Sequence, residues 1–325
     1  MTGPTTGPSS GHVPVLLERV LELLAPPLTT ELGHDRPVVV DATLGLGGHT
    51  EAMLTRFDDL HVIGIDRDPE ALARAGRRLE PFGDRVTLTH AVYDEVRHVV
   101  RDAGFEAVCG VLFDLGVSSM QLDLAERGFA YSQDAPLDMR MNPEDELTAA
   151  DVLNTYAAAD LARVLHVYGE ERFARRIASA VVAARADEPF SSSARLVDLI
   201  RDSIPAAARR TGGNPAKRTF QALRIEVNDE LGAYERALPA ALEAVEPGGR
   251  VVVLAYHSLE DRITKRAFAR VTKSDVPRDV PFVPEGHEPR FRLLTRGAEQ
   301  ASDAETAGNP RARSVRLRAV ERVAA

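Results

Sequence analysis

The chain has 325 residues, of which 44% are hydrophobic and 27% charged, and its formal net charge is −9. This composition is typical of a globular protein and excludes a disordered tail, a collagen-like chain and a coiled-coil rod. No stretch approaches the ~18 consecutive apolar residues that a membrane span needs, so we expect no contact with a membrane. Residues 1–11 lack the basic and apolar segments of a signal or transit peptide, and we expect a flexible leader there.

The first third of the chain contains four short runs rich in β-branched residues, at 38–41, 61–66, 85–89 and 108–114. Their starts are separated by 23, 24 and 23 residues, and the stretches between them have helical patterns, such as the one that begins at Pro69. Strands and helices that alternate at this spacing predict right-handed crossovers and a parallel sheet. The runs are almost wholly apolar, which indicates a sheet covered on both faces.

The next clear strand, 250–255, begins 142 residues after the fourth, so the sequence predicts an insertion between them. Helical patterns fill it, and Thr148 and Asp151 are spaced as a capping box. We predict an α/β domain made of two parts, 12–135 and 216–325, with an all-helical domain inserted at 136–215. A helix is expected over 216–231, another over 259–271, and a possibly antiparallel pair of strands at 291–295 and 315–320. We expect a mobile loop at 296–310.

Cys109 is the only cysteine, which excludes an internal disulfide and a cysteine-based zinc site. The histidines do not follow metal-ligand spacings, so no metal is expected. These features, together with the lack of an export signal, favour the cytoplasm. The sequence does not determine the oligomeric state, and a homodimer is compatible with it.

The carboxyl ends of the first, second and fourth strands carry polar residues, and ligands bind at these ends in open parallel sheets. The first strand runs into the glycine-rich stretch DATLGLGGH at 41–49. Asp66 ends the second strand 21 residues after Gly45, where a carboxylate can accept hydrogen bonds from ribose. Asp114 ends the fourth strand. Each aspartate could instead be an ordinary turn or cap residue.

Two cofactors suit this layout. A dinucleotide would favour G-x-G-x-x-G, but Thr50 occupies the position of the third glycine. S-adenosylmethionine has no pyrophosphate, and its cationic sulfur suits a pocket rich in carboxylates. The alternatives to a methyltransferase are an NAD-dependent oxidoreductase and a non-catalytic ribosome-assembly factor.

Nine blocks in this order resemble the bacterial ribosomal RNA small-subunit methyltransferase H family, also called MraW. They are GHVPVLL at 11–17, DATLGLGGH at 41–49, GIDRD at 64–68, DLGVSSMQLD at 114–123, RGF at 127–129, DMRM at 138–141, RTFQALRI at 218–225, YHSLEDR at 256–262 and NPRARS at 309–314. The resemblance implies a Rossmann-like class I S-adenosylmethionine-dependent methyltransferase with an inserted helical domain. It also implies N4-methylation of one cytosine, 1402 in the usual numbering, in the decoding region of 16S rRNA within the small ribosomal subunit.

Site residues follow from the same resemblance. Asp66 would hold the ribose, and Tyr93 would lie against the adenine, where either tyrosine or phenylalanine can stack. Asp114 and Gln121 would face the methionine end. The residues that would line the cofactor from the glycine-rich stretch are Gly47, Gly48 and His49.

Two residues are candidates for catalysis. The stretch DLGVS at 114–118 replaces the Asp/Asn-Pro-Pro-aromatic run of many amino methyltransferases, so Asp114 is one candidate to accept the amine protons. His257 is the other, since imidazole can accept a proton near neutral pH, but it could equally hydrogen-bond a neighbouring loop or a phosphate. Basic residues that could contact RNA, or could be ordinary surface, are Arg218, Arg224, Arg262, Lys265, Arg266 and the arginines of 311–318.

Overall fold

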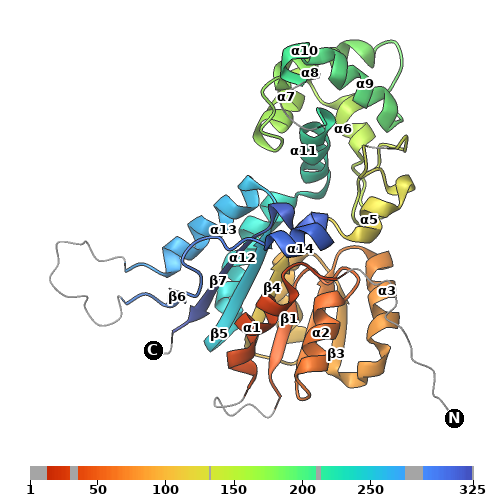
Figure 1. The fold of residues 1–325 in the computed structure, drawn as a ribbon. Helices are drawn as coiled ribbons and strands as arrows, with labels where there is room; N and C mark the ends of the chain where they lie inside the picture. The colour runs from red at the N-terminus through yellow and green to blue at the C-terminus, as the bar shows by residue number, and fades with distance from the viewer. Residues whose placement is uncertain (1–12, 30–35, 132, 210–213, 275–287, 324–325) are drawn as a thin grey trace, which may run out of the picture. The chain divides into compact units, whose positions relative to one another are not determined.

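The protein is described by a computed structural model that covers residues 13–29, 36–131, 133–209, 214–274 and 288–323. The chain divides into two compact units (Figure 1). Unit 1 consists of 1–66, 70–116 and 237–325, and unit 2 of 67–69 and 117–236. The predicted leader at 1–11 lies outside the described residues. None of the helices in the described ranges is long and apolar enough to cross a membrane.

Unit 1 is built on a seven-stranded sheet with the order β3-β2-β1-β4-β5-β7-β6. Strands β1 to β5 pair in parallel with one another, whereas β7 is antiparallel to both β5 and β6. The predicted Rossmann-like α/β fold and the predicted antiparallel pair are therefore confirmed. The strands are β1 (Val38–Asp41), β2 (His61–Asp66), β3 (Val86–His90), β4 (Val108–Asp114), β5 (Val245–Ala255), β6 (Phe291–Leu293) and β7 (Arg316–Arg322).

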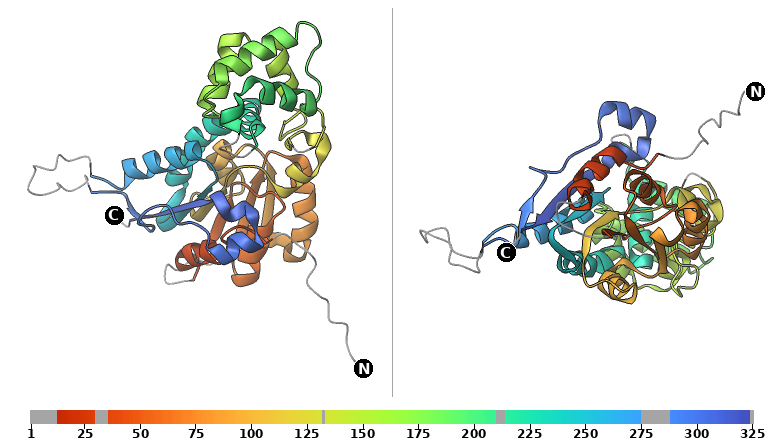
Figure 2. Two further views of the ribbon diagram at one scale, coloured as in Figure 1. Left: turned by 45° about the horizontal axis from the view of Figure 1, so that its top comes forward. Right: turned by 90° about the horizontal axis from the view of Figure 1, so that it is seen from below.

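Helices surround this sheet (Figure 2). One hydrophobic cluster joins the first three helices to strand residues that include Val252, Leu254 and Leu317. Because β1 and most of β2 and β4 are buried along their lengths, the sheet is covered on both faces there. The helices of this unit are α1 (Leu17–Leu28), α2 (Gly48–Arg56), α3 (Pro69–Leu79), α4 (Val96–Asp102), α13 (Ser258–Val271) and α14 (Asp303–Gly308).

The strand order reverses between β1 and β4. From β1 the chain moves outward through β2 to β3, and it then returns to pair β4 with the other edge of β1. In an open parallel sheet this reversal leaves a crevice at the carboxyl ends of the two central strands. Asp41 ends β1 and Asp114 ends β4, so the topology brings these two carboxylates to that edge.

Unit 2 is helical within the described residues, and its core is a separate hydrophobic cluster. Thr148 caps α6 as predicted, since its side chain accepts a hydrogen bond from the backbone N–H of Asp151. The helices are α5 (Ser119–Asp123), α6 (Ala149–Thr155), α7 (Ala158–Val167), α8 (Ala174–Ala184), α9 (Ser193–Ser203), α10 (Ala206–Arg209) and α11 (Ala216–Asn228). The boundary with unit 1 falls inside α12 (Glu230–Ala244).

The compact helical unit is wider than the range 136–215 expected from the sequence, because 117–135 and α11 pack with the helices between them. The single helix predicted over 216–231 is instead two, since Asp229 has a left-handed backbone with φ of 46°. The loop predicted at 296–310 is wrong. Glu299 forms two backbone hydrogen bonds with Leu317, and α14 begins after Ser302, whose side chain accepts from the N–H of Glu305.

Candidate functional site

The glycine-rich loop between β1 and α2 is tied directly to the end of β2. The N–H of Gly45 donates a 2.7 Å hydrogen bond to Oδ2 of Asp66. Gly47 caps α2 with φ of 75°, and a Cβ there would lie 3.1 Å from Cδ1 of Leu79. A side chain at this position would therefore be strained in its backbone and crowded by its neighbour. The 21-residue spacing seen in the sequence corresponds to a contact that fixes the loop.

Asp114 is held at the end of β4 by residues from three other segments. Its backbone N–H donates to the hydroxyl of Thr43 at 2.6 Å. The Tyr256 hydroxyl donates to Oδ1 at 2.6 Å, and Nδ1 of His49 lies 3.6 Å from Oδ2. The carboxylate keeps 26% of its exposure, so it is oriented by the protein and still accessible.

Tyr256 is suited to act as a permanent donor to this carboxylate. Burial raises the pKa of its phenol well above the ordinary value, and the negative charge of Asp114 raises it further. The phenol therefore stays protonated over the whole physiological pH range. Its hydrogen bond fixes one oxygen of Asp114 and leaves the carboxylate to interact elsewhere through its remaining lone pairs.

A second carboxylate, Asp41, lies buried beneath the site. It accepts hydrogen bonds from the Thr50 hydroxyl at 2.7 Å and from the N–H of Thr43 at 3.3 Å. Burial raises the pKa of Asp41; the nearby His49 opposes this shift, and the negative charge of Asp114 adds to it. His49 is itself fixed, because its Nε2 lies 3.1 Å from the carbonyl oxygen of Val15.

Tyr93 follows β3 and begins a short 3-10 turn. Its ring meets the ring of Phe113 edge to face, with centroids 6.0 Å apart and an interplanar angle of 84°. Phe113 is fully buried and immediately precedes Asp114. The packing therefore places a half-buried aromatic ring beside the strand that carries the accessible carboxylate.

His257 lies at the junction of β5 and α13. Glu260 accepts hydrogen bonds from the backbone N–H of Tyr256 at 2.7 Å and of His257 at 3.2 Å. Nε2 of His257 lies 3.0 Å from Oε1 of Glu260, but without hydrogen-bond geometry. Within the described ranges, Nδ1 of this buried ring has no hydrogen-bond partner. Such an orphaned polar atom is uncommon and calls for an explanation.

The side chains of unit 1 fit an adenosyl sulfonium. Asp66 offers a carboxylate of the kind that binds ribose hydroxyls, Tyr93 an aromatic face for a purine, and Asp114 a negative charge near a cationic sulfur. All three follow the carboxyl ends of parallel strands. Because Gly47 has no side chain, a ligand could approach the backbone closely there.

Comparison with known proteins places these features in a family. The sequence pattern of the MraW methylase family matches residues 9–323.

The chain belongs to the MraW methylase family. A relative from Nocardioides sp., named Ribosomal RNA small subunit methyltransferase H, is 68% identical over 98% of each chain. A relative with the same name from Streptomyces avermitilis is 60% identical over 97% of this chain and 98% of its own. Among solved structures, an rRNA methylase from Streptococcus thermophilus matches 97% of this chain and all of its own at 13% identity, with a TM-score of 0.44.

Membership in the MraW family confirms the resemblance inferred from the sequence, and it leaves the oxidoreductase alternative without support. The residues expected to line the cofactor are distributed over both units. Gly47, Gly48, His49, Asp66, Tyr93 and Asp114 belong to unit 1. Gln121 belongs to unit 2, where its amide donates to Asp68 at 2.9 Å and its carbonyl oxygen accepts from the N–H of Ser118 at 3.0 Å.

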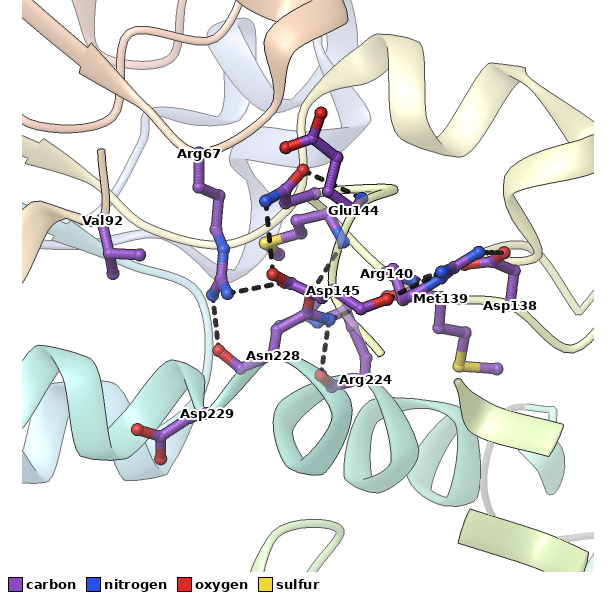
Figure 3. A network of polar contacts seen from close by, with 12 residues as sticks. Arg67, Val92, Asp138, Met139, Arg140, Glu144, Asp145, Arg224, Asn228 and Asp229 are labelled. Atoms are coloured by element: carbon purple, nitrogen blue, oxygen red, sulfur yellow. Dashed lines mark hydrogen bonds and ion pairs between the residues drawn. The ribbon is translucent and has the colours of Figure 1, made fainter. Parts of the chain in front are cut away.

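Two sequence blocks of the MraW family are joined by a residue that the sequence analysis missed (Figure 3). The amide nitrogen of Asn228 donates to the carbonyl oxygens of Met139 and Arg224, each at 2.8 Å. Its oxygen accepts from the N–H of Met141 at 2.7 Å, and its backbone carbonyl accepts from Arg67. Asn228 ends α11 beside the left-handed Asp229, so an amide just before a helix stop was the available signal.

Several arginines that the sequence suggested for RNA contact form ion pairs within this MraW protein, although the side chain of Arg316 remains 44% exposed. Both ends of the Arg224 guanidinium bind Glu230, at 2.7 and 2.9 Å. Arg316 and Arg318 both bind Asp261. Lys265 and Arg266, by contrast, are exposed on α13.

Proposed function

We propose that this protein transfers a methyl group from S-adenosylmethionine to the exocyclic N4 of one cytosine, 1402 in the usual numbering, in the decoding region of 16S rRNA. The observation that carries the proposal is the oriented Asp114 carboxylate. It accepts a hydrogen bond from the Tyr256 hydroxyl and lies beside His49, where the strand order of the sheet reverses. The names of relatives at 57–68% identity over nearly the whole chain support the substrate.

The proposed cofactor site uses the strand ends of unit 1. Asp66 would accept hydrogen bonds from the ribose hydroxyls while it holds the loop through Gly45. Tyr93 would pack on the adenine, and Asp114 and Gln121 would face the methionine end. Gly47, Gly48 and His49 would line the remaining wall. When bound, the cofactor supplies a methyl group on a cationic sulfur.

The N4 lone pair of cytosine is delocalised into the ring, so the amine is a poor nucleophile. The protein's contribution is to hold N4 in line with the methyl carbon, and positioning of this kind can lower a barrier by roughly 7–11 kcal/mol. The base must also leave its stack, which costs a few kcal/mol. Asp114 would accept a hydrogen bond from N4–H and so increase electron density on the nitrogen. The N4–C bond forms as the C–S bond breaks, and the extra proton leaves N4.

The proton acceptor is assigned to Asp114, with His257 as the second candidate. The His257 side chain is only 12% exposed and lies beside Glu260, which favours a role in holding the β5–α13 junction. A His257→Ala enzyme assayed at saturating cofactor separates the two roles. Turnover within a few-fold of the parent excludes His257 as the base, whereas a loss of 100-fold or more with unchanged cofactor affinity would reassign the step to it.

The proposed partner is 16S rRNA within the small ribosomal subunit, and the proposed compartment is therefore the cytoplasm. A homodimer remains a prediction from the sequence. The proposal is tested by incubating the protein with methyl-labelled cofactor and small subunits from a strain that lacks this enzyme. Label should appear at N4 of a single cytosine. Subunit binding without label transfer would instead support a non-catalytic assembly factor, and label at another base would refute the assigned position.

A further inference from the structure

Helix α13 presents an unusual surface. Between Ser258 and Ser274, the exposed residues are all lysines or arginines. Lys265, Arg266, Arg270 and Lys273 form no ion pair within the described part of the chain. We call the exposed side of α13 and its following turn the basic face; its residues are Arg262, Lys265, Arg266, Arg270 and Lys273.

The acidic residues of the same helix point into the protein. Glu260 is 3% exposed and accepts two backbone hydrogen bonds at the start of α13. Asp261 is 7% exposed and binds Arg316 and Arg318 of β7. Because both carboxylates are used internally, neither neutralises the basic face. Lys265, Arg266, Arg270 and Lys273 are therefore exposed and carry no ion pair within the described residues, in a chain whose net charge is −9.

Some other exposed cations of unit 1 are paired with carboxylates. On α3, Arg74 pairs with Glu70 of its own helix. On α4, Arg97 pairs with Glu243. Pairs of this kind are an ordinary solvated surface. The basic face differs in having five cations on one side and no acidic residue from 262 to 274.

The basic face also has a suitable place and length. α13 begins one residue after His257 and two after Tyr256, which binds Asp114. Arg262 and Lys273 are 11 positions apart, which corresponds to about 16 Å along a helix. A strand whose target base is held near Asp114 could thus continue along α13.

We infer that the basic face of α13 is a docking surface for the phosphate backbone of the RNA substrate. This inference rests on the proposed function and adds to it the surface by which the RNA is held. Phosphate contacts position a nucleic acid without reading its sequence, and each contact adds to the salt dependence of binding. The basic face therefore sets affinity, while the strand-end residues act on the base.

The test compares two variants with the same change in charge. One carries Lys265→Gln, Arg266→Gln, Arg270→Gln and Lys273→Gln. The matched control carries Arg74→Gln, Arg77→Gln, Arg97→Gln and Arg101→Gln, which alter exposed cations of α3 and α4. Binding to protein-free 16S rRNA and to unmethylated small subunits is measured from 50 to 200 mM salt, together with cofactor affinity and label transfer.

Four lost phosphate contacts should lower the slope of log affinity against log salt by about 3. The parent should then lose roughly 50- to 150-fold more affinity than the α13 variant over this fourfold range of salt. We expect the α13 variant to raise KM for the subunit with cofactor affinity and kcat unchanged, and the control variant to behave as the parent.

Three results would overturn the inference. The α13 variant could keep the salt slope of the parent, or the control variant could lose as much affinity as the α13 variant. The α13 variant could also bind small subunits more weakly while its binding to protein-free rRNA is unchanged. The last result would indicate an acidic ribosomal protein as the partner. Failure of the proposed function is recognised separately, because the parent itself would then transfer no label to the small subunit.

Discussion

Asp66 and Asp114 end two parallel strands of the same sheet, yet their partners suit them to different tasks. Asp66 binds a backbone N–H of the glycine-rich loop, so it couples the loop to any sugar that it holds. Asp114 accepts a hydrogen bond from a phenol and lies near an imidazole, so its orientation depends on one side chain of α2 and one that follows β5. This difference is the basis of our proposal that the first carboxylate binds the cofactor and the second orients the reacting amine.

Tyr256→Phe tests this assignment at the scale of one hydrogen bond. Phenylalanine keeps the ring but removes the donor to Asp114, and a hydrogen bond to a charged group contributes about 1.5–3 kcal/mol. We expect kcat to fall roughly 10- to 100-fold, with little change in the KM of either substrate. Because burial and Asp114 raise the pKa of Tyr256 well above 10, the ratio of parent to variant should be constant from pH 6 to 9.

A matched control for this variant lies in unit 2. The Tyr156 hydroxyl donates to Glu226 at 2.9 Å, so Tyr156→Phe removes the same kind of hydrogen bond elsewhere. Steady-state kinetics of both variants show whether the hydrogen bond from Tyr256 to Asp114 contributes to kcat. A Tyr256→Phe enzyme with kcat within twofold of the parent would show that Asp114 needs no orientation by the phenol.

At the scale of the element, local patterns predicted the sheet well and some turns poorly. Strands β1 to β4 could be predicted from β-branched runs at regular spacing, because each strand carries this signal in its own residues. Asp66 followed from its distance to Gly45. The contact of Tyr256 with Asp114 could not be predicted, because the two residues are 142 positions apart and only the strand order brings them together. The missed helix α14 did have a local signal, the pair Ser302 and Glu305.

The carboxylate of Asp261 links helix α13 to strand β7, and this contact makes a prediction about pH. Asp261 binds Arg318 at 2.7 Å and Arg316 at 3.1 Å. Burial alone would raise the pKa of Asp261, but the hydrogen bonds and charges of the two arginines outweigh it, and the pKa lies below 3.8. The carboxylate therefore stabilises the fold fully above that pH, and the contribution is lost as the pH falls through the lowered pKa.

Asp261→Asn should lower the free energy of unfolding by about 1.5–3 kcal/mol at pH 7. The difference in free energy of unfolding between parent and variant should shrink as the pH falls below about 3.8, because Asp261 of the parent is then protonated and has lost its charge as well. Urea unfolding between pH 7 and 3 measures it, with the exposed Asp59→Asn as the control. A difference that stays constant with pH would contradict the assignment to charge.

At the scale of the whole molecule, the helical unit is not one continuous insertion. Residues 67–69, which follow β2, belong to it together with 117–236. Asp68 is fully buried, and it binds the guanidinium of Arg127 at 2.9 Å and the amide of Gln121 at 2.9 Å. Arg127 also donates to the carbonyl oxygens of Arg140 and Met141. One buried carboxylate therefore links two distant segments of chain into a single core.

This link should behave as one energetic unit in a double-mutant cycle. Removal of one partner leaves the other charge buried without its counter-ion, which costs about 3–5 kcal/mol, whereas removal of both costs less than the sum. We expect Asp68→Asn and Arg127→Met each to destabilise the protein strongly, and the double variant to be little worse than either. Denaturant unfolding of all four proteins measures the coupling. If the losses in free energy of unfolding of the two single variants simply add, the ion pair does not couple residues 67–69 to the core of unit 2.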